Sequence, residues 1–111
     1  MGISTHILDT SRGRPAHGVA VTLLREQADG AQSIVNVGVT DADGRVKGLI
    51  EGQPDTGLYT LRFAVGEYFL GLGQEAFYPQ VEVSFVVKSV AEHYHVPLLL
   101  NPFGYSTYRG S

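Results

Sequence analysis

The chain has 111 residues and a formal net charge of −3, and 43% of its residues are hydrophobic. These values predict one folded domain, residues 1–111, and exclude an intrinsically disordered chain. The charge and the lack of a dense Lys/Arg cluster argue against nucleic acid as a partner, and no apolar run is long enough to span a membrane.

Cysteine is absent from the chain, which excludes disulfides and thiolate metal sites. The start of the sequence shows no basic segment followed by an apolar stretch, as a signal peptide would. We therefore expect a cytoplasmic protein.

Alternation of apolar and polar residues is the dominant pattern, and it predicts β-strands. The strand candidates, in chain order, are residues 4–9, 19–24, 33–39, 59–65, 81–87 and 93–100. Turn signals separate them at residues 11–15, 28–30, 41–44 and 101–104. Strands separated in this way predict an all-β sandwich or a small barrel. One segment differs, because residues 66–73 fit about two helical turns, with Gly73 as the C-cap.

The two faces of each strand differ in what they carry. Successive strand residues point to opposite sides, so His6 shares a face with Ser4 and Leu8. In the strand over residues 93–100, one face carries His93, His95, Pro97 and Leu99, and the other carries Tyr94, Val96, Leu98 and Leu100. Both faces are apolar towards the end of this strand, and a sandwich covers only one of them, so we expect a partner subunit to cover the second. Pro97 cannot donate to a ladder, which predicts an unpaired side there.

Histidine exchanges protons near neutral pH, so His6 and His95 are candidates for acid–base catalysis. The alternative for each is a structural histidine that is hydrogen-bonded to a neighbouring strand. A zinc site formed by His6, His93 and His95 is a further alternative, because two histidines at i and i+2 on a strand face the same way. No Asp, Glu or Cys follows at matching spacing, so we expect no functional metal.

Arg45 follows the tight turn at residues 41–44, and taken alone it reads as a solvated surface arginine. The C-terminus gathers a phenol, a guanidinium and a hydroxyl in Tyr108-Arg109-Gly110-Ser111. Its alternative reading is simply an ordered last strand. If that strand continues, Arg109 faces away from Tyr108 and pairs with the C-terminus or with a neighbouring subunit.

Several segments together resemble the transthyretin-related 5-hydroxyisourate hydrolases, and the similarity covers nearly the whole chain. They are His-Ile-Leu-Asp-Thr at 6–10, Gly-Arg-Pro-Ala at 13–16, Asp-Gly-Arg at 43–45 with Gly-Leu at 48–49, His-Tyr-His-Val-Pro-Leu-Leu at 93–99, and Tyr-Ser-Thr-Tyr-Arg-Gly-Ser at 105–111. The resemblance implies a transthyretin-like sandwich of two four-stranded sheets with one short helix. It also implies a homotetramer with active sites in a channel between dimers.

The same resemblance implies the reaction, which is hydrolysis of 5-hydroxyisourate to 2-oxo-4-hydroxy-4-carboxy-5-ureidoimidazoline in urate degradation, without a cofactor. The implied catalytic residues are His6, Arg45, His95 and Ser111, and the implied substrate-binding residues are Tyr108, His6 and Arg45. A guanidinium suits an oxygen-rich purine derivative, because it forms two parallel hydrogen bonds and stabilises charge developing on a carbonyl oxygen.

Two other functions remain as alternatives. One is a binding protein of the same fold, like transthyretin, which carries thyroid hormone and lacks these histidines and the closing tetrapeptide. The other is a sandwich module for protein contacts, which would leave the three polar motifs unexplained. The sequence favours the enzyme because it carries His6, Arg45, His95 and the closing tetrapeptide together.

Overall fold

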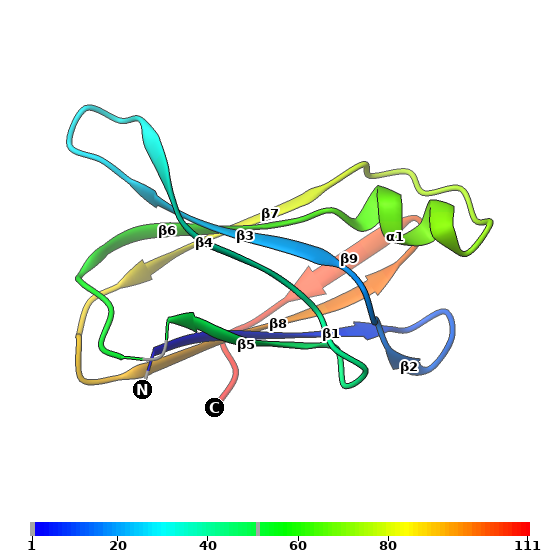
Figure 1. Cartoon of the computed structure of the whole chain (residues 1–111), viewed down its shortest axis with the longest axis horizontal. Helices are drawn as coiled ribbons and strands as arrows, with labels where there is room; N and C mark the ends of the chain where they lie inside the picture. Colours follow the sequence, from blue (N-terminus) through cyan, green and yellow to red (C-terminus); the bar gives the residue numbers. More distant parts are fainter. Residues whose placement is uncertain (1, 51) are drawn as a thin grey trace.

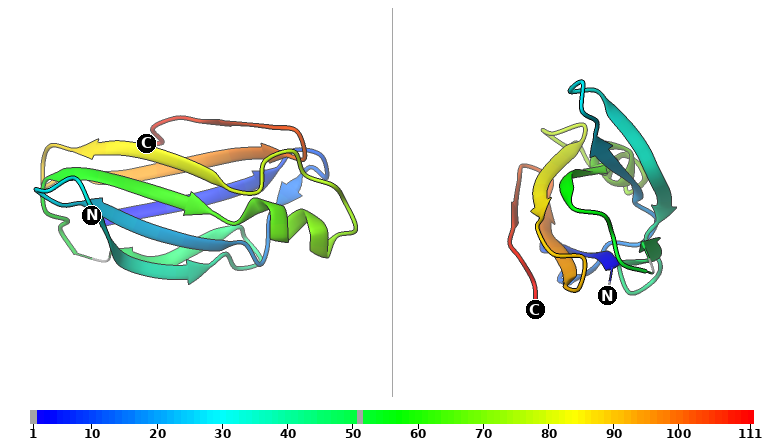
Figure 2. Two further views of the ribbon diagram at one scale, coloured as in Figure 1. Left: turned by 90° about the horizontal axis from the view of Figure 1, so that it is seen from above. Right: turned by 90° about the vertical axis from the view of Figure 1, so that its left-hand side faces the viewer.

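The computed structural model describes residues 2–50 and 52–111. They form two β-sheets that pack face to face, with a short helix at one end of the sandwich (Figure 1). The two sheets enclose the core when the molecule is viewed from its end (Figure 2). No helix in the described residues is long and apolar enough to cross a membrane.

Within the described residues, one sheet has five strands and the other has four. The first sheet contains β1 (Gly2–Asp9), β2 (Arg14–Pro15), β5 (Arg45–Ile50), β8 (His93–Asn101) and β9 (Gly104–Thr107), in the order β2-β1-β8-β9 with β5 also paired to β1. The second contains β3 (Ala20–Glu26), β4 (Gln32–Val39), β6 (Gly57–Phe63) and β7 (Val81–Val87), in the order β4-β3-β6-β7. The predicted all-β sandwich is confirmed. The first sheet exceeds the expected four strands because the two residues of β2 pair with the end of β1.

The predicted helix is α1 (Val65–Gly71). Gly73 follows the C-cap residue Leu72 with φ of 72°, and its N–H donates to the Leu70 carbonyl, so it ends the helix as expected. Val65 was expected to continue the strand before it. Instead β6 ends at Phe63, and Val65 begins α1 while its side chain stays buried in the core.

The core lies between the sheets and confirms the predicted orientation of β1 and β8. Along β1 from Ile3 to Leu8, Ile3, Thr5 and Ile7 are buried, and they alternate with the half-buried Ser4, His6 and Leu8. In β8, the core-facing residues are Tyr94, Val96, Leu98 and Leu100, all buried. His6 and His95 therefore lie on the outer face of the first sheet.

Pro97 lies where the pairing of β8 with the last strand is interrupted. The β8–β9 ladder runs from Asn101 opposite Gly104 to Leu98 opposite Thr107, and then resumes as a bridge between His95 and Gly110. Pro97 has no N–H to donate into this gap, as the sequence predicted. It is nevertheless buried, because the returning C-terminal segment packs against it.

Asp9 is a buried carboxylate that ties the end of β1 to α1. It is fully buried, its Oδ1 accepts hydrogen bonds from the backbone and hydroxyl of Ser11, and its Oδ2 accepts one from the Tyr68 hydroxyl at 2.8 Å. Burial, followed by this bond to Asp9, raises the pKa of Tyr68, so the phenol stays protonated and remains a donor.

We expect Tyr68→Phe to lower the free energy of unfolding by about 1–3 kcal/mol, because it leaves a buried carboxylate oxygen without its donor. Urea unfolding at fixed protein concentration measures this. Tyr78→Phe is the control, since Tyr78 is exposed and contacts its neighbours Phe77 and Tyr105 through its ring. Equal losses in both variants would contradict the role of the Asp9 contact.

Candidate functional site

Three of the predicted site residues lie across adjacent strands on the outer face of the first sheet. His6 of β1 lies opposite Arg45 of β5 and beside Pro97 of β8. Ser4, two residues before His6, lies beside His95. The register therefore brings together His6, Arg45 and His95, which are separated by up to 89 positions in sequence.

The turn before β5 fixes the position of Arg45. Asp41 Oδ1 accepts hydrogen bonds from the backbone N–H groups of Asp43 and Arg45, at 2.9 and 3.0 Å. Gly44 has φ of 73°, and a Cβ atom there would lie 2.4 Å from the Ile7 carbonyl oxygen, so only glycine lets the turn approach β1 so closely. Ile7 N–H in turn donates to the Gly44 carbonyl at 2.8 Å. The turn is thus docked next to His6, and the exposed Arg45 side chain starts from there.

Two neighbours hold the half-buried ring of His95. Its Nδ1 lies 2.8 Å from Ser4 Oγ. On its other edge, a Cβ atom at Gly110 would lie 2.6 Å from His95 Cδ2, so the absence of a side chain at Gly110 makes room for the ring. The Gly110 N–H also donates to the His95 carbonyl at 2.8 Å. These contacts leave Nε2 as the ring nitrogen available to a substrate.

The surroundings of His95 lower its pKa below the ordinary histidine value. Burial is the largest cause, followed by the positive charges of Arg45, His93 and His6. Both causes disfavour the imidazolium, because burial removes water and nearby cations repel a further positive charge. His95 is therefore neutral at neutral pH and able to accept a proton.

The C-terminal segment, residues 108–111, returns along β8. Continuing the β9 register places Tyr108 opposite Pro97 and Gly110 opposite His95. Tyr108 is 58% exposed and Ser111 is also exposed, and the register puts Tyr108 on the same face as Pro97 and His95. The predicted residues of the segment thus adjoin the histidine face.

Arg109 points to the opposite side from Tyr108, as expected, but its partners differ from those anticipated. Its guanidinium stacks over the Tyr94 ring at 4.7 Å and lies 3.3 Å from Glu92 Oε1. Within the chain, Glu92 and Tyr94 thus take the place expected for the C-terminus, and pairing with a neighbouring subunit stays a prediction. Arg109 ties the segment to the beginning of β8, because Glu92 directly precedes that strand.

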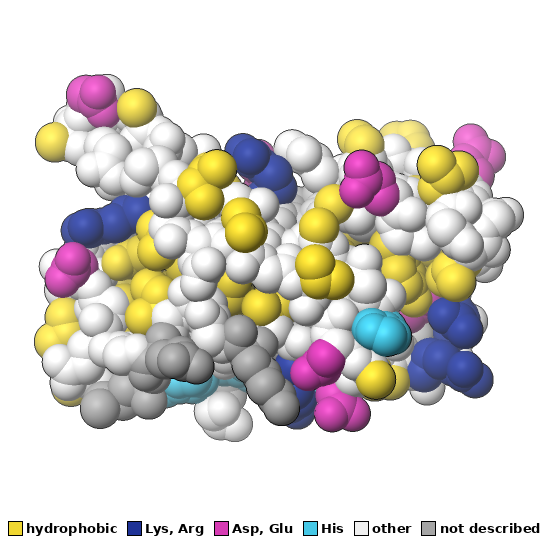
Figure 3. All heavy atoms as spheres, in the orientation of Figure 1, with side chains coloured by type: hydrophobic (Ala, Val, Ile, Leu, Met, Phe, Trp, Pro, Cys, Tyr) yellow, Lys and Arg dark blue, Asp and Glu magenta, His cyan; other side chains and the backbone are white. Residues whose placement is uncertain are grey.

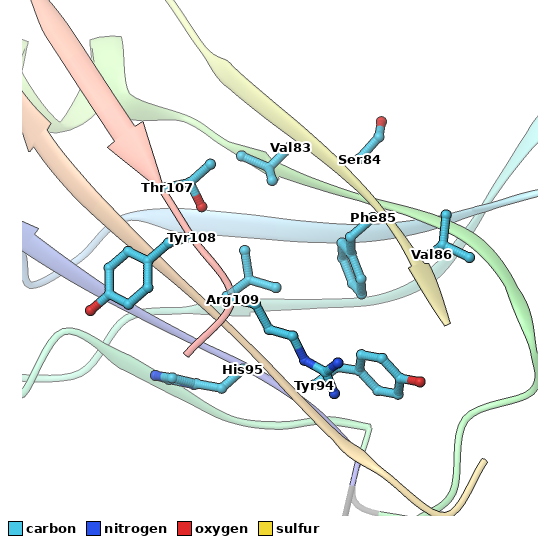
Figure 4. A pocket seen from close by; sticks show the side chains of 10 residues that line it. Val83, Ser84, Phe85, Val86, Tyr94, His95, Thr107, Tyr108 and Arg109 are labelled. Carbon is cyan, nitrogen blue, oxygen red and sulfur yellow. The ribbon is translucent and has the colours of Figure 1, made fainter. Parts of the chain in front are cut away.

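A cavity of about 230 Å³ lies between β7 and the C-terminal segment (Figure 4). His95 lines the cavity together with Phe85, Tyr94, Tyr108 and Arg109. The close-up shows Arg109 and Tyr94 side by side, with the His95 ring directed away from them. His6 and Arg45 do not line it. The cavity therefore borders the candidate site only at His95 and Tyr108.

The arrangement of the histidines on this face can be compared with the alternative of a zinc site. Within residues 2–50 and 52–111, no group of three or more His, Asp or Glu side chains is arranged to hold a metal ion. The rings of His93 and His95 stack with centroids 6.4 Å apart, and Ser4 Oγ lies between their nitrogens. These two histidines are engaged with a hydroxyl.

Sequence reasoning did not assign a site role to Ser4 or Gly110. Strand parity placed Ser4 on the histidine face, but only the parallel register with β8 shows that it meets His95. The proximity of Gly110 to the imidazole depends on how the last residues return along β8. The one sequence feature that could have pointed to Gly110 is that it lacks a side chain, unlike the other three residues of the tetrapeptide at 108–111.

Comparisons with known proteins agree with this geometry. A sequence model of the HIUase/Transthyretin family matches residues 3–110. 5-Hydroxyisourate hydrolase 2 of Rhizobium meliloti is 47% identical over 98% of this chain and 95% of its own length. The structure of Klebsiella pneumoniae 5-hydroxyisourate hydrolase superimposes with a TM-score of 0.86 at 38% identity, covering 98% of this chain and 92% of that one. Sea bream transthyretin in complex with thyroxine gives a TM-score of 0.92 at 35% identity, covering 97% and 93%.

We expect Arg45→Gln to raise the pKa of His95, because it removes the largest of the positive charges that lower it. On acidification, the variant would therefore protonate His95 at a higher pH than the wild-type protein does. An NMR titration of the His95 ring measures this without any substrate. Arg62→Gln is the matched control, since Arg62 lies in the second sheet and pairs with Glu82 at 2.7 Å. An unchanged or lower His95 pKa in Arg45→Gln would contradict the electrostatic account.

Proposed function

From the premise that this chain belongs to the HIUase/Transthyretin family, we propose that it hydrolyses 5-hydroxyisourate to 2-oxo-4-hydroxy-4-carboxy-5-ureidoimidazoline in urate degradation. The observation that carries the proposal is the placement of His6, Arg45 and a neutral His95 on one open face. The hydrolase from Rhizobium meliloti, at 47% identity, supports the same reaction.

His95 acts as the general base in this proposal. Its Nε2 takes a proton from water as the water oxygen bonds to the carbonyl carbon of the cyclic substrate. The ring carbon–nitrogen bond then breaks, and the leaving nitrogen takes up a proton. A base whose pKa lies below neutral pH is already deprotonated, so it needs no prior loss of a proton.

The other residues bind the substrate and stabilise charge. Arg45 offers two parallel N–H donors to the oxygen-rich ring and stabilises the oxyanion formed during attack. His6, directly opposite Arg45, binds the substrate and assists proton transfer. Tyr108 binds the substrate from the C-terminal segment, and the exposed Ser111 beside Gly110 positions the attacking water.

The fold alone does not separate this enzyme from a hormone-binding protein, because transthyretin in complex with thyroxine superimposes equally well. The residues on the outer face do separate the two functions. A row of imidazole and guanidinium groups suits proton transfer and an oxygen-rich ring better than an apolar hormone. Thyroxine binding without turnover would support the alternative.

We expect His6→Ala, Arg45→Ala and His95→Ala each to slow turnover about 10²–10⁴-fold, the usual effect of losing a proton-transfer or charge-stabilising group. Decay of freshly prepared 5-hydroxyisourate, followed by absorbance, measures this, and circular dichroism checks folding. His17→Ala is the control, because His17 is exposed outside the site.

Turnover should also survive dialysis against a chelator. Near-wild-type rates in all three site variants would show that the site is wrongly assigned, and zinc-dependent recovery after chelation would favour the metal alternative.

We also propose a homotetramer located in the cytoplasm. Apolar side chains exposed beside β9 and α1 support assembly; they include Phe77, Phe103 and Leu70, at 69%, 68% and 75% exposure. Further hydrophobic side chains lie among charged groups on the side seen in Figure 3. The outer face of β8 contributes less to assembly than the sequence predicted, because the C-terminal segment itself packs against Pro97.

Native mass spectrometry at micromolar concentration should therefore show four copies, because burying such side chains on association is favourable. An active, monodisperse monomer would rule out both the assembly and a site that needs it. Cell fractionation tests the location.

A further inference from the structure

The hydroxyl of Ser4 lies between two imidazole rings on the outer face of the first sheet. Its Oγ is 2.9 Å from His93 Nε2 and 2.8 Å from His95 Nδ1. The parallel register places Ser4 beside His95, and the two-residue repeat of β8 puts His93 on the same face. His93 is exposed to solvent, whereas Ser4 and His95 are half-buried. The three groups form a path from the site to the surface.

The single hydroxyl proton of Ser4 limits how it can hydrogen-bond to His93 and His95. A serine hydroxyl has one proton, so it donates to only one of the two ring nitrogens and accepts from the other. In one arrangement His95 Nδ1–H donates to Ser4, and Ser4 donates to His93 Nε2. In the other, His93 Nε2–H donates to Ser4, and Ser4 donates to His95 Nδ1. His95 Nε2 is bare in the first arrangement and protonated in the second.

We propose that Ser4 and His93 are positioning residues that form a proton relay, which switches His95 between its basic and acidic forms. This proposal rests on the proposed hydrolysis. The substrate meets His95 Nε2, while Ser4 and His93 act through the opposite nitrogen of the ring.

The relay accounts for every proton in the reaction. As the water oxygen bonds to the carbonyl carbon, His95 Nε2 takes the water proton. His95 Nδ1–H passes to Ser4 Oγ, the Ser4 proton passes to His93 Nε2, and His93 releases its Nδ1 proton to solvent. When the carbon–nitrogen bond breaks, the leaving nitrogen takes the Nε2 proton of His95. The relay then runs in reverse, with a solvent proton entering at His93.

The geometry keeps the path intact during turnover. The Cδ2 edge of the His95 ring occupies the space that a side chain at Gly110 would fill, while its Nδ1 edge lies against Ser4. Ser4 pairs with His95 through the unbroken β1–β8 ladder, whereas the β1–β5 register shifts between Ile3 and Thr5, so β8 is the strand that positions Ser4. A hydroxyl held by a paired strand has a fixed aim.

The test compares Ser4→Ala with Ser4→Thr, which restores the hydroxyl, and with Thr5→Val. Thr5 is the matched control because it is the next residue of β1, but its hydroxyl faces the core and donates to the Val96 carbonyl at 2.7 Å. Two quantities are measured: kcat with 5-hydroxyisourate, and the tautomer of His95 from the ¹⁵N NMR signals of its ring without substrate. His93→Gln serves as a second break in the relay, because glutamine does not titrate.

We expect Ser4→Ala and His93→Gln to lower kcat by about 10- to 100-fold with little change in KM, as the loss of a partner that orients a functional imidazole typically does. In Ser4→Ala the Nδ1–H tautomer of His95 should lose population, whereas Ser4→Thr should retain both rate and tautomer. Thr5→Val should keep the wild-type kcat per folded molecule.

Unchanged kcat in Ser4→Ala and His93→Gln would overturn the relay, and so would an equal loss in Thr5→Val or a loss of rate with an unchanged His95 tautomer. Failure of the proposed function is distinguishable from these outcomes. In that case the wild-type protein would not hydrolyse 5-hydroxyisourate at all.

Discussion

The parallel pairing of β1 with β8 is the constraint on which the rest of the site depends. The register runs from Gly2 beside His93 to Asp9 beside Leu100, and it places Ser4 beside His95 and His6 beside Pro97 on the outer face. A slip of one residue would turn the histidines into the core and the apolar residues out to solvent. Ile3, Ile7, Leu98 and Leu100, each at most 2% exposed, resist such a slip. Hydrophobic burial on the inner face therefore fixes the alignment of polar groups on the outer face.

Strand alternation predicted the faces of β1 and β8 correctly, because that pattern is local and burial enforces it. The end of α1 was also predictable, since Gly73 supplies the backbone conformation that closes a helix. Val65 misled the strand assignment, because its burial suits both a strand and the first turn of a helix. The meeting of Ser4 with His95 was not predictable, because strand pairing over 91 residues leaves no local pattern.

The C-terminal segment shows how one strand can serve both structure and chemistry. Pro97 interrupts its pairing with β8, so Tyr108 and Arg109 are released from the ladder before Gly110 rejoins it. Arg109 then secures the segment through Tyr94 and Glu92, on the side away from the histidines. The Arg109 guanidinium thus lies on the opposite side of the segment from Tyr108, while Gly110 pairs with His95. It attaches the segment without adding a further charge to the histidine face.

The sandwich supports more than one function, so the argument for catalysis rests on the placement of charge. Superposition on transthyretin shows that the backbone is compatible with a binding protein. On the outer face, burial of His95, followed by the charges of Arg45, His93 and His6, lowers the pKa of its imidazole. Repulsion among like charges is unfavourable for folding, and it persists where a neutral imidazole is useful. The burial and the nearby positive charge that disfavour the imidazolium keep His95 neutral and able to take a proton from water.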